Sequence, residues 1–443
     1  MNLKIAAQGF ANLIVRRYVG PFWHRRIWLN KTQWLSKEEL AELQLVLLKR
    51  MVYHAERYVP YYQTLMKEKG ITTADIHSLD DINLLPILTK QQVLAAGESL
   101  HSHNYQKWML RYAHTGGTTG TPMNIYRSPF SIGTEHAFVR RQWDWAGIKM
   151  SDKTAYLTGR IIVPPDQTTG NLYTYDPFMK ELILSTYHLN EANANKYIKR
   201  IETQKCIAIV GYPSAIHFLA QVYKESSQKK LTIKAIMTSS ETLSDTAKKS
   251  IEDAFNCQVY DFYGSAERVC YIFTCEKGHY HVQPEYGYTE FIPVESGSNV
   301  CHVISTGFWN YAMPFIRYDL GDIVIRSDHE CGCGRKFPCI ERIDGRSGDI
   351  IRTASGREFG SAILTHLLYG TNNIIESQIN QDKIDHIRID YVPNKQFCEN
   401  DMVCFKNLIE KHLPTHEIKV EFNRVYKIER TISGKLRPVI STI

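Results

Sequence analysis

Short apolar segments alternate with helical segments between residues 155 and 251. Residues 206–211 and 234–238 have the composition of buried strands, and residues 192–203 and 215–226 have the pattern of helices. This alternation is typical of parallel sheets, whose strands are joined by helical crossovers. The sequence therefore predicts an α/β fold, in which ligands gather at the carboxyl ends of the strands.

The pattern changes toward the C-terminus. Residues 258–263 predict another buried strand, residues 288–324 predict β-hairpins, and the last hundred residues carry their own strands and helices. A chain of 443 residues exceeds the usual size of a single core. We therefore expect a large N-terminal domain of residues 1–345 and a small α+β C-terminal domain of residues 346–443.

A segment rich in glycine and threonine, Thr115-Gly116-Gly117-Thr118-Thr119-Gly120-Thr121-Pro122, is the first candidate site. Its backbone N–H groups and hydroxyls suit a loop that wraps a triphosphate. It is not a Walker loop, because the Gly-Lys-Ser/Thr ending is absent. An ordinary flexible turn is the alternative interpretation. A lysine near the C-terminus, Lys435 in Ser433-Gly434-Lys435, is its proposed distant counterpart.

Two further motifs carry groups suited to a nucleotide. Tyr263-Gly264-Ser265-Ala266-Glu267 follows a predicted strand, where an aromatic ring can cover adenine and a carboxylate can hold Mg²⁺. Asp322, at the end of Arg317-Tyr318-Asp319-Leu320-Gly321-Asp322, suits two ribose hydroxyls. The alternatives are an ordinary strand end for the first motif and a charged hairpin turn for the second.

In this order, the motifs resemble those of the adenylate-forming (ANL) superfamily, and within it the phenylacetate–CoA ligase family with its capsular-polysaccharide (CapK-like) branch. The resemblance covers about residues 35–443. It implies a mobile C-terminal lid and an AMP-binding N-terminal domain. The implied contacts are residues 115–120 with the β- and γ-phosphates, Tyr263 and Glu241 with adenine, Glu267 with Mg²⁺, Asp322 with ribose, Arg346 with the nucleotide near the hinge, and Lys435 with the carboxylate and α-phosphate.

The resemblance implies an ATP-dependent ligase that forms an acyl-adenylate and passes the acyl group to CoA. An alternative acceptor is a sugar or amine in surface-polysaccharide assembly. A second alternative is a non-catalytic, zinc-stabilised scaffold. Ala266, where the family commonly has a hydroxyl residue, and Gly348, where it has a carboxylate, favour the scaffold, although Ser265 can replace the hydroxyl. The retained Glu267, Asp322 and Lys435 oppose it.

A cluster of thiol and imidazole groups predicts a metal site. Cys275 and His281 lie close together in the sequence, as do Cys331 and Cys333, and the nearby glycines let both segments bend. Three thiolates and one imidazole form a closed tetrahedral set for structural zinc. His279 in place of His281, and Cys339 in place of one thiolate, are alternatives. Reduced cysteines without a metal are the other interpretation.

The composition limits the partners and the location. A net charge of +7, with basic residues that we take to be scattered, favours small anionic substrates over nucleic acid. No apolar run is long enough to cross a bilayer. The N-terminal segment predicts a packed helix, with weak amphipathic contact to a membrane surface as the alternative. Ten cysteines without a secretory signal favour the cytoplasm, and a homodimer is expected from the resemblance alone.

Overall fold

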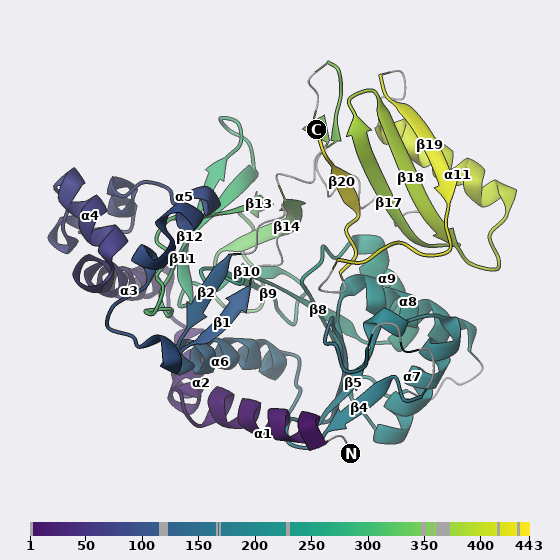
Figure 1. The fold of residues 1–443 in the computed structure, drawn as a ribbon, viewed down its shortest axis with the longest axis horizontal. Coiled ribbons are helices and arrows are strands. Elements are labelled where there is room, and N and C mark those ends of the chain that lie inside the picture. The colour runs from purple at the N-terminus through teal and green to yellow at the C-terminus, as the bar shows by residue number, and fades with distance from the viewer. Residues whose placement is uncertain are drawn as a thin grey trace.

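The computed structural model describes residues 3–114, 123–164, 167, 170–226, 231–346, 351–355, 358–359, 373–413, 417–431 and 435–443. A large sheet of twelve strands and a separate C-terminal sheet of four strands organise the chain (Figure 1). The predicted mixed α/β fold is therefore confirmed. The division at residue 345 stays a prediction, although the last strand of the large sheet ends at Arg346.

Helices dominate the N-terminal part of the chain. They are α1 (Leu3–Arg17), α2 (Phe22–Thr32), α3 (Lys37–Tyr58), α4 (Pro60–Lys69), α5 (Lys90–Ala96) and α6 (Pro129–Trp145). Ser36 and Glu39 form a capping box that begins α3, and Thr89 and Gln92 form another that begins α5. Pro60 is the first residue of α4. Proline is tolerated there because the N–H group that it lacks would have no partner within the first turn of the helix. Short 3₁₀ turns cover 73–75, 80–84, 97–100, 107–109 and 186–188.

The first half of the large sheet is mainly parallel. It contains β3 (Thr154–Leu157), β4 (Tyr173–Asp176), β5 (Glu181–Leu184), β6 (Ala208–Gly211), β7 (Ala235–Ser239) and β8 (Gln258–Gly264), with helices α7 (Glu191–Gln204), α8 (Pro213–Glu225) and α9 (Asp245–Phe255). Strands β5, β3, β6, β7 and β8 are parallel neighbours, and β4 is an antiparallel edge strand. Fully buried residues such as Ile209, Ile236 and Val259 form its core. Apolar strands of this kind need helices on both faces of a parallel sheet.

The second half of the sheet is antiparallel and joins the first through β8 and β9. Its strands are β9 (Tyr271–Thr274), β10 (Tyr280–Val282), β11 (Gly287–Pro293), β12 (Val300–Gly307), β13 (Tyr318–Ser327) and β14 (Cys339–Arg346). The predicted hairpins of residues 288–324 correspond to β11, β12 and β13. Two small sheets pair β1 (Arg111–His114) with β2 (Asn124–Arg127), and β15 (Ile351–Arg352) with β16 (Glu358–Phe359).

The C-terminal sheet has its own core. Its elements are β17 (Ile374–Lys383), β18 (His386–Pro393), α11 (Glu399–His412), β19 (Lys419–Arg424) and β20 (Val439–Ser441). Ile379, Ile389 and Phe405 are fully buried between the sheet and α11. Figure 1 shows this domain beside α8 and α9, with the segment that enters β20 lying toward the large domain. Among the described residues, no helix is both long and apolar enough to cross a bilayer.

Candidate nucleotide and metal sites

Glu241 lies just beyond the carboxyl end of β7, where it contacts the C-terminal domain. One of its carboxylate oxygens accepts a hydrogen bond from the Ser214 amide at 3.1 Å, and the other accepts one from the Leu436 amide at 2.7 Å. The Ser214 amide belongs to the first turn of α8, where the helix dipole favours a negative charge. Because Leu436 follows Lys435, this contact brings the predicted lysine segment to the carboxyl ends of the parallel strands.

Tyr263 and Asp322 meet beside that edge. The Tyr263 hydroxyl donates a hydrogen bond to Asp322 Oδ2, and Asp322 pairs with Arg346 across strands β13 and β14. Burial and the negative charge of Asp322 raise the pKa of Tyr263 well above its usual value, so the phenol remains a donor. The backbone thus brings three predicted nucleotide residues together. The side chain of Arg346 lies outside the described part of the structure.

The remainder of the Tyr263 motif forms a second polar group. Tyr318 donates a hydrogen bond to Glu267 at 3.2 Å. The Ser265 hydroxyl is buried and has no hydrogen-bond partner among the described residues, so it is available to a ligand. Gly264 is required here, because a Cβ would lie 2.2 Å from the Tyr271 ring. Tyr318 was missed as a site residue, although it stands in the same motif as Asp322.

Arg430 connects the two domains and was also missed. Its guanidinium donates a hydrogen bond to Ser214 Oγ at 2.9 Å and forms an ion pair with Glu376 on β17. Burial and the nearby Glu241 raise the pKa of Glu376, whereas Arg430 lowers it. Arg430 therefore offsets the repulsion that Glu241 exerts on the Glu376 carboxylate. Only its position five residues before Lys435 gives a signal in the sequence.

Several predicted residues lie outside the described part of the chain. They are Thr115, Gly116, Gly117, Thr118, Thr119 and Gly120, together with Ser433, Gly434 and Gly348. The strands that precede and follow the glycine-rich segment, β1 and β2, are paired from Arg111 with Arg127 to His114 with Asn124. At the other end of the chain, the Lys435 amide donates a hydrogen bond to Thr431 Oγ1 at 3.1 Å.

Cys275, His281, Cys331 and Cys333 form the metal candidate. One ligand atom from each of these residues lies within 4.8 Å of all the others. The Cys275 and Cys331 sulfurs are 3.6 Å apart, and Cys333 Sγ is 3.5 Å from His281 Nε2. A tetrahedral zinc with Zn–S bonds of about 2.3 Å separates its sulfur ligands by about 3.8 Å. The four groups therefore have the spacing of a zinc site.

The surroundings of these residues also fit a metal. Burial raises the pKa of Cys331 to about 12 and lowers that of His281 to about 4. Buried thiolates therefore need a cation, whereas the neutral imidazole is ready to bind one. Cys339 Sγ lies 3.5 Å from Nδ1, the other ring nitrogen, and His279 packs against His329 instead. The four predicted ligands fit better than either alternative.

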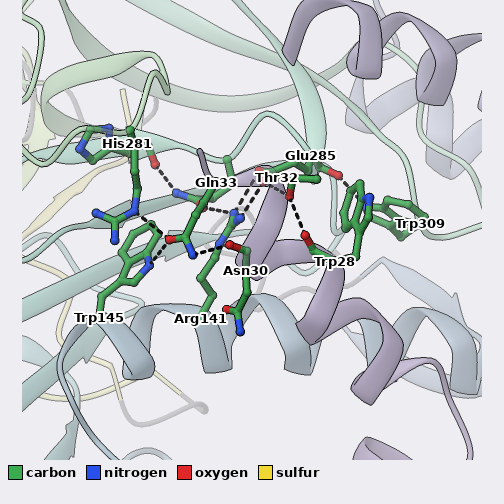
Figure 2. Close-up of polar contacts among 11 residues, drawn as sticks. Trp28, Asn30, Thr32, Gln33, Arg141, Trp145, His281, Glu285 and Trp309 are labelled. Atoms are coloured by element: carbon green, nitrogen blue, oxygen red, sulfur yellow. Dashed lines mark hydrogen bonds and ion pairs between the residues drawn. The ribbon is translucent and has the colours of Figure 1, made fainter. Parts of the chain in front are cut away.

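A buried polar network connects His281 with the N-terminal helices (Figure 2). Gln283 donates a hydrogen bond to the His281 carbonyl, and its own side-chain oxygen accepts one from Arg141. Arg141 also forms an ion pair with Glu285 at 2.7 Å, and Thr32 of α2 donates a hydrogen bond to that carboxylate. Because Arg141 and Glu285 are both buried, each needs the other. The metal candidate is thus joined to α2 and α6.

Comparisons with known proteins show what this chain is similar to. Residues 351–442 match the CapK C-terminal domain family. The chain is 27% identical to Protein CapK of Staphylococcus aureus over 411 residues, which cover 91% of this chain and 90% of that protein. It is 22% identical to a phenylacetate-coenzyme A ligase of Thermus thermophilus over 334 residues, covering 72% of each protein.

A solved 2-hydroxyisobutyryl-CoA ligase has the same fold. In its postadenylation state it matches with a TM-score of 0.71 at 18% identity, and 92% of this chain and 90% of that chain are covered. In its thioesterification state the TM-score is 0.57 at 19% identity, with 92% and 91% covered. The chain is thus similar to Protein CapK and to a phenylacetate-coenzyme A ligase, its residues 351–442 match the CapK C-terminal domain, and it has the fold of the adenylate-forming acyl-CoA ligases.

Proposed function

We propose that this protein is an ATP-dependent ligase that activates a carboxylate as an acyl-adenylate and transfers the acyl group to CoA. The observation that carries the proposal is the hydrogen bond from the Leu436 amide to Glu241, because it joins the Lys435 segment to the strand edge where Tyr263 and Asp322 meet. Ligands of open α/β sheets bind at such an edge. The similarity in fold to a solved 2-hydroxyisobutyryl-CoA ligase supports the same interpretation.

Each group has a role in the proposed reaction. Asp322 accepts hydrogen bonds from the ribose, and Tyr263 covers the adenine. Lys435 neutralises charge that develops on the α-phosphate when the carboxylate attacks it and pyrophosphate leaves. Glu267, held by Tyr318, would bind Mg²⁺, which supplies further charge neutralisation at the phosphates. Ser265 offers the hydroxyl that Ala266 lacks.

The proposal is tested by measuring pyrophosphate release from MgATP over a panel of aryl, fatty and amino acids. Release that requires one acid and rises with CoA would establish an acyl-CoA ligase. Release of the same size with and without CoA would instead indicate another acceptor. No release with any acid, despite ATP binding, would favour the scaffold alternative.

Transfer to a sugar or amine in capsular or surface polysaccharide is the second candidate function. The similarity to CapK favours it, because that similarity extends over more of the chain than the similarity to phenylacetate-coenzyme A ligase. Both candidates share the adenylate-forming step. The acceptor that discharges the acyl-adenylate distinguishes them.

We also propose that Cys275, His281, Cys331 and Cys333 hold one structural zinc ion. Four protein ligands leave no open coordination position, which is typical of a structural rather than a catalytic zinc. The ion would fasten the hairpin of β9 and β10 to the 331–333 segment. Through Gln283 and Arg141, the same hairpin is connected to α6.

Replacing Arg430 with alanine should slow adenylation about tenfold or more, because a small displacement of catalytic groups has a large effect on rate. The variant loses the hydrogen bond to Ser214 and leaves Glu376 buried near Glu241 without its cation. Pyrophosphate release measures this step. Arg424→Ala, an exposed arginine on β19, is the matched control and should behave like the wild type. Equal rates for both variants would contradict the role of Arg430.

A further inference from the structure

The positive charge of this chain is concentrated at one end. The first 37 residues contain seven of the 53 Lys and Arg residues and none of the 46 Asp and Glu residues. The excess charge of +7 therefore belongs to this segment, and the remainder of the chain is neutral. We interpreted the basic residues as scattered, and this interpretation is wrong, because the excess of basic over acidic residues lies within residues 1–37. Such a local excess attracts an anionic surface.

The same segment exposes large apolar side chains. Six of the twenty exposed large hydrophobic residues in the described part of the chain lie within its first 34 residues. They are Phe10, Tyr18, Val19, Trp23, Ile27 and Trp34. Phe178, which packs against Phe10, is also exposed and extends this surface. Soluble monomers rarely concentrate exposed apolar residues in this way without a partner.

The inner face of α2 is well packed, so its exposed residues do not come from a loose helix. Phe22 and Leu29 of α2 are buried in the main core. Gly20 brings the turn between the two helices onto α6, where a Cβ would lie 2.8 Å from the Pro129 carbonyl oxygen. The predicted packed helix is therefore present. Its outer face still has no covering element in the described structure.

The outer face of α2 combines aromatic, aliphatic and basic groups. Trp23, Ile27 and Lys31 follow one another at spacings of four residues, so they share a side of the helix. Trp34 lies just beyond the end of α2, where Arg335 packs over its ring. Trp23 and Ile27 are 41% and 60% exposed. Lys31 is also exposed. This mixture of tryptophan, aliphatic side chains and lysine is typical of helices at a membrane–water interface.

Nearby acidic groups neutralise part of this charge. Asp144 is paired with both Arg26 and Arg140, and Glu330 is paired with both Lys37 and Lys336. These acidic side chains have basic partners from outside the segment as well as from within it. Glu135 and Glu181 also lie near Arg16 and Arg17. The charge that the face presents to the outside therefore comes mainly from Lys31, which is exposed.

We propose that the outer face of α1 and α2, formed by the six exposed residues and Lys31, binds the surface of an anionic lipid bilayer. The aromatic and aliphatic side chains would enter the headgroup region, and Lys31, the exposed basic side chain of α2, would face the lipid phosphates. Figure 1 shows both helices on the side of the molecule opposite the C-terminal domain. Binding there leaves that domain free to move. This inference does not depend on the proposed enzymatic activity.

Flotation of the full-length protein with lipid vesicles tests the proposal. We expect binding to vesicles of phosphatidylcholine and phosphatidylglycerol in equal parts, weaker binding to phosphatidylcholine alone, and loss of binding at high salt. Each interfacial charge changes the affinity about fivefold, so Lys31→Glu, a change of two charges, should weaken binding about 25-fold. Trp23→Ser/Ile27→Ser should weaken it at least about 30-fold.

Trp108→Ser is the matched control, because Trp108 is 82% exposed but lies outside this face. This variant should bind vesicles like the wild type, and circular dichroism should show that every variant is folded. Equal binding to neutral and anionic vesicles, or no binding to either, would overturn the proposal. A wild-type dimer in solution that Trp23→Ser/Ile27→Ser converts to a monomer would also overturn it, since a second copy would then cover the face.

Discussion

Alanine at Lys435 should slow pyrophosphate release by at least about 100-fold while the protein remains folded. Loss of a fixed positive group at a site of developing negative charge typically costs a factor of 10² to 10³ in rate. The Leu436 amide contact with Glu241 uses the backbone and survives the substitution. The C-terminal domain should therefore still contact the large domain, but without the positive charge of the Lys435 side chain.

The two half-reactions separate this role from a structural one. Acyl transfer from a supplied acyl-adenylate to the acceptor should stay near the wild-type rate in Lys435→Ala, because the α-phosphate has already reacted. Lys427→Ala, an exposed lysine in the same segment, is the control and should retain both steps. Equal loss of both steps in Lys435→Ala would contradict the assigned role and indicate a folding defect.

Local sequence patterns predicted many of the helices and strands, because the formation of these elements depends largely on residues that are close in the sequence. The alternation of strands and helices predicted β6, α8 and their neighbours, and Thr89 caps α5 as its side chain requires. The joining of parallel and antiparallel strands into one sheet was not predicted. That joining depends on the pairing of β8 with β9, and no pattern within either strand specifies its neighbour.

Some residues of the candidate site could also be predicted from the sequence, and others could not. Tyr263 and Asp322 were recognised by their motifs, and their hydrogen bond follows from the sheet that carries them. Arg430 and Ser214 are 216 residues apart in sequence, and their contact depends on how the C-terminal domain is oriented. Domain orientation is not encoded in the spacing of residues within a segment. The Arg430 contact therefore required the structure.

Metal analysis of the purified protein should find about one zinc ion per chain, and Cys333→Ser should lose it. The unfolding free energy should then fall by about 4 kcal/mol if free zinc exceeds its dissociation constant about 1,000-fold. The physical reason is that the free energy of zinc binding stabilises the folded protein, and this contribution is lost with the metal. The ligand atoms of the four residues lie within 4.8 Å of one another in the folded chain. Chelation of the wild-type protein should produce the same loss.

Two control substitutions distinguish the metal from a cluster of reduced thiols. Cys404→Ser, an exposed cysteine on α11, should keep the zinc and the stability of the wild type. Cys339→Ser should keep the zinc as well, because Cys339 faces Nδ1 of His281 while Cys333 faces Nε2. If Cys339→Ser loses the zinc and Cys333→Ser keeps it, the fourth ligand is Cys339 and not Cys333. A folded wild type that contains no metal, with stability unchanged by chelator, would refute the site, because the buried cysteines would then be stable as neutral thiols.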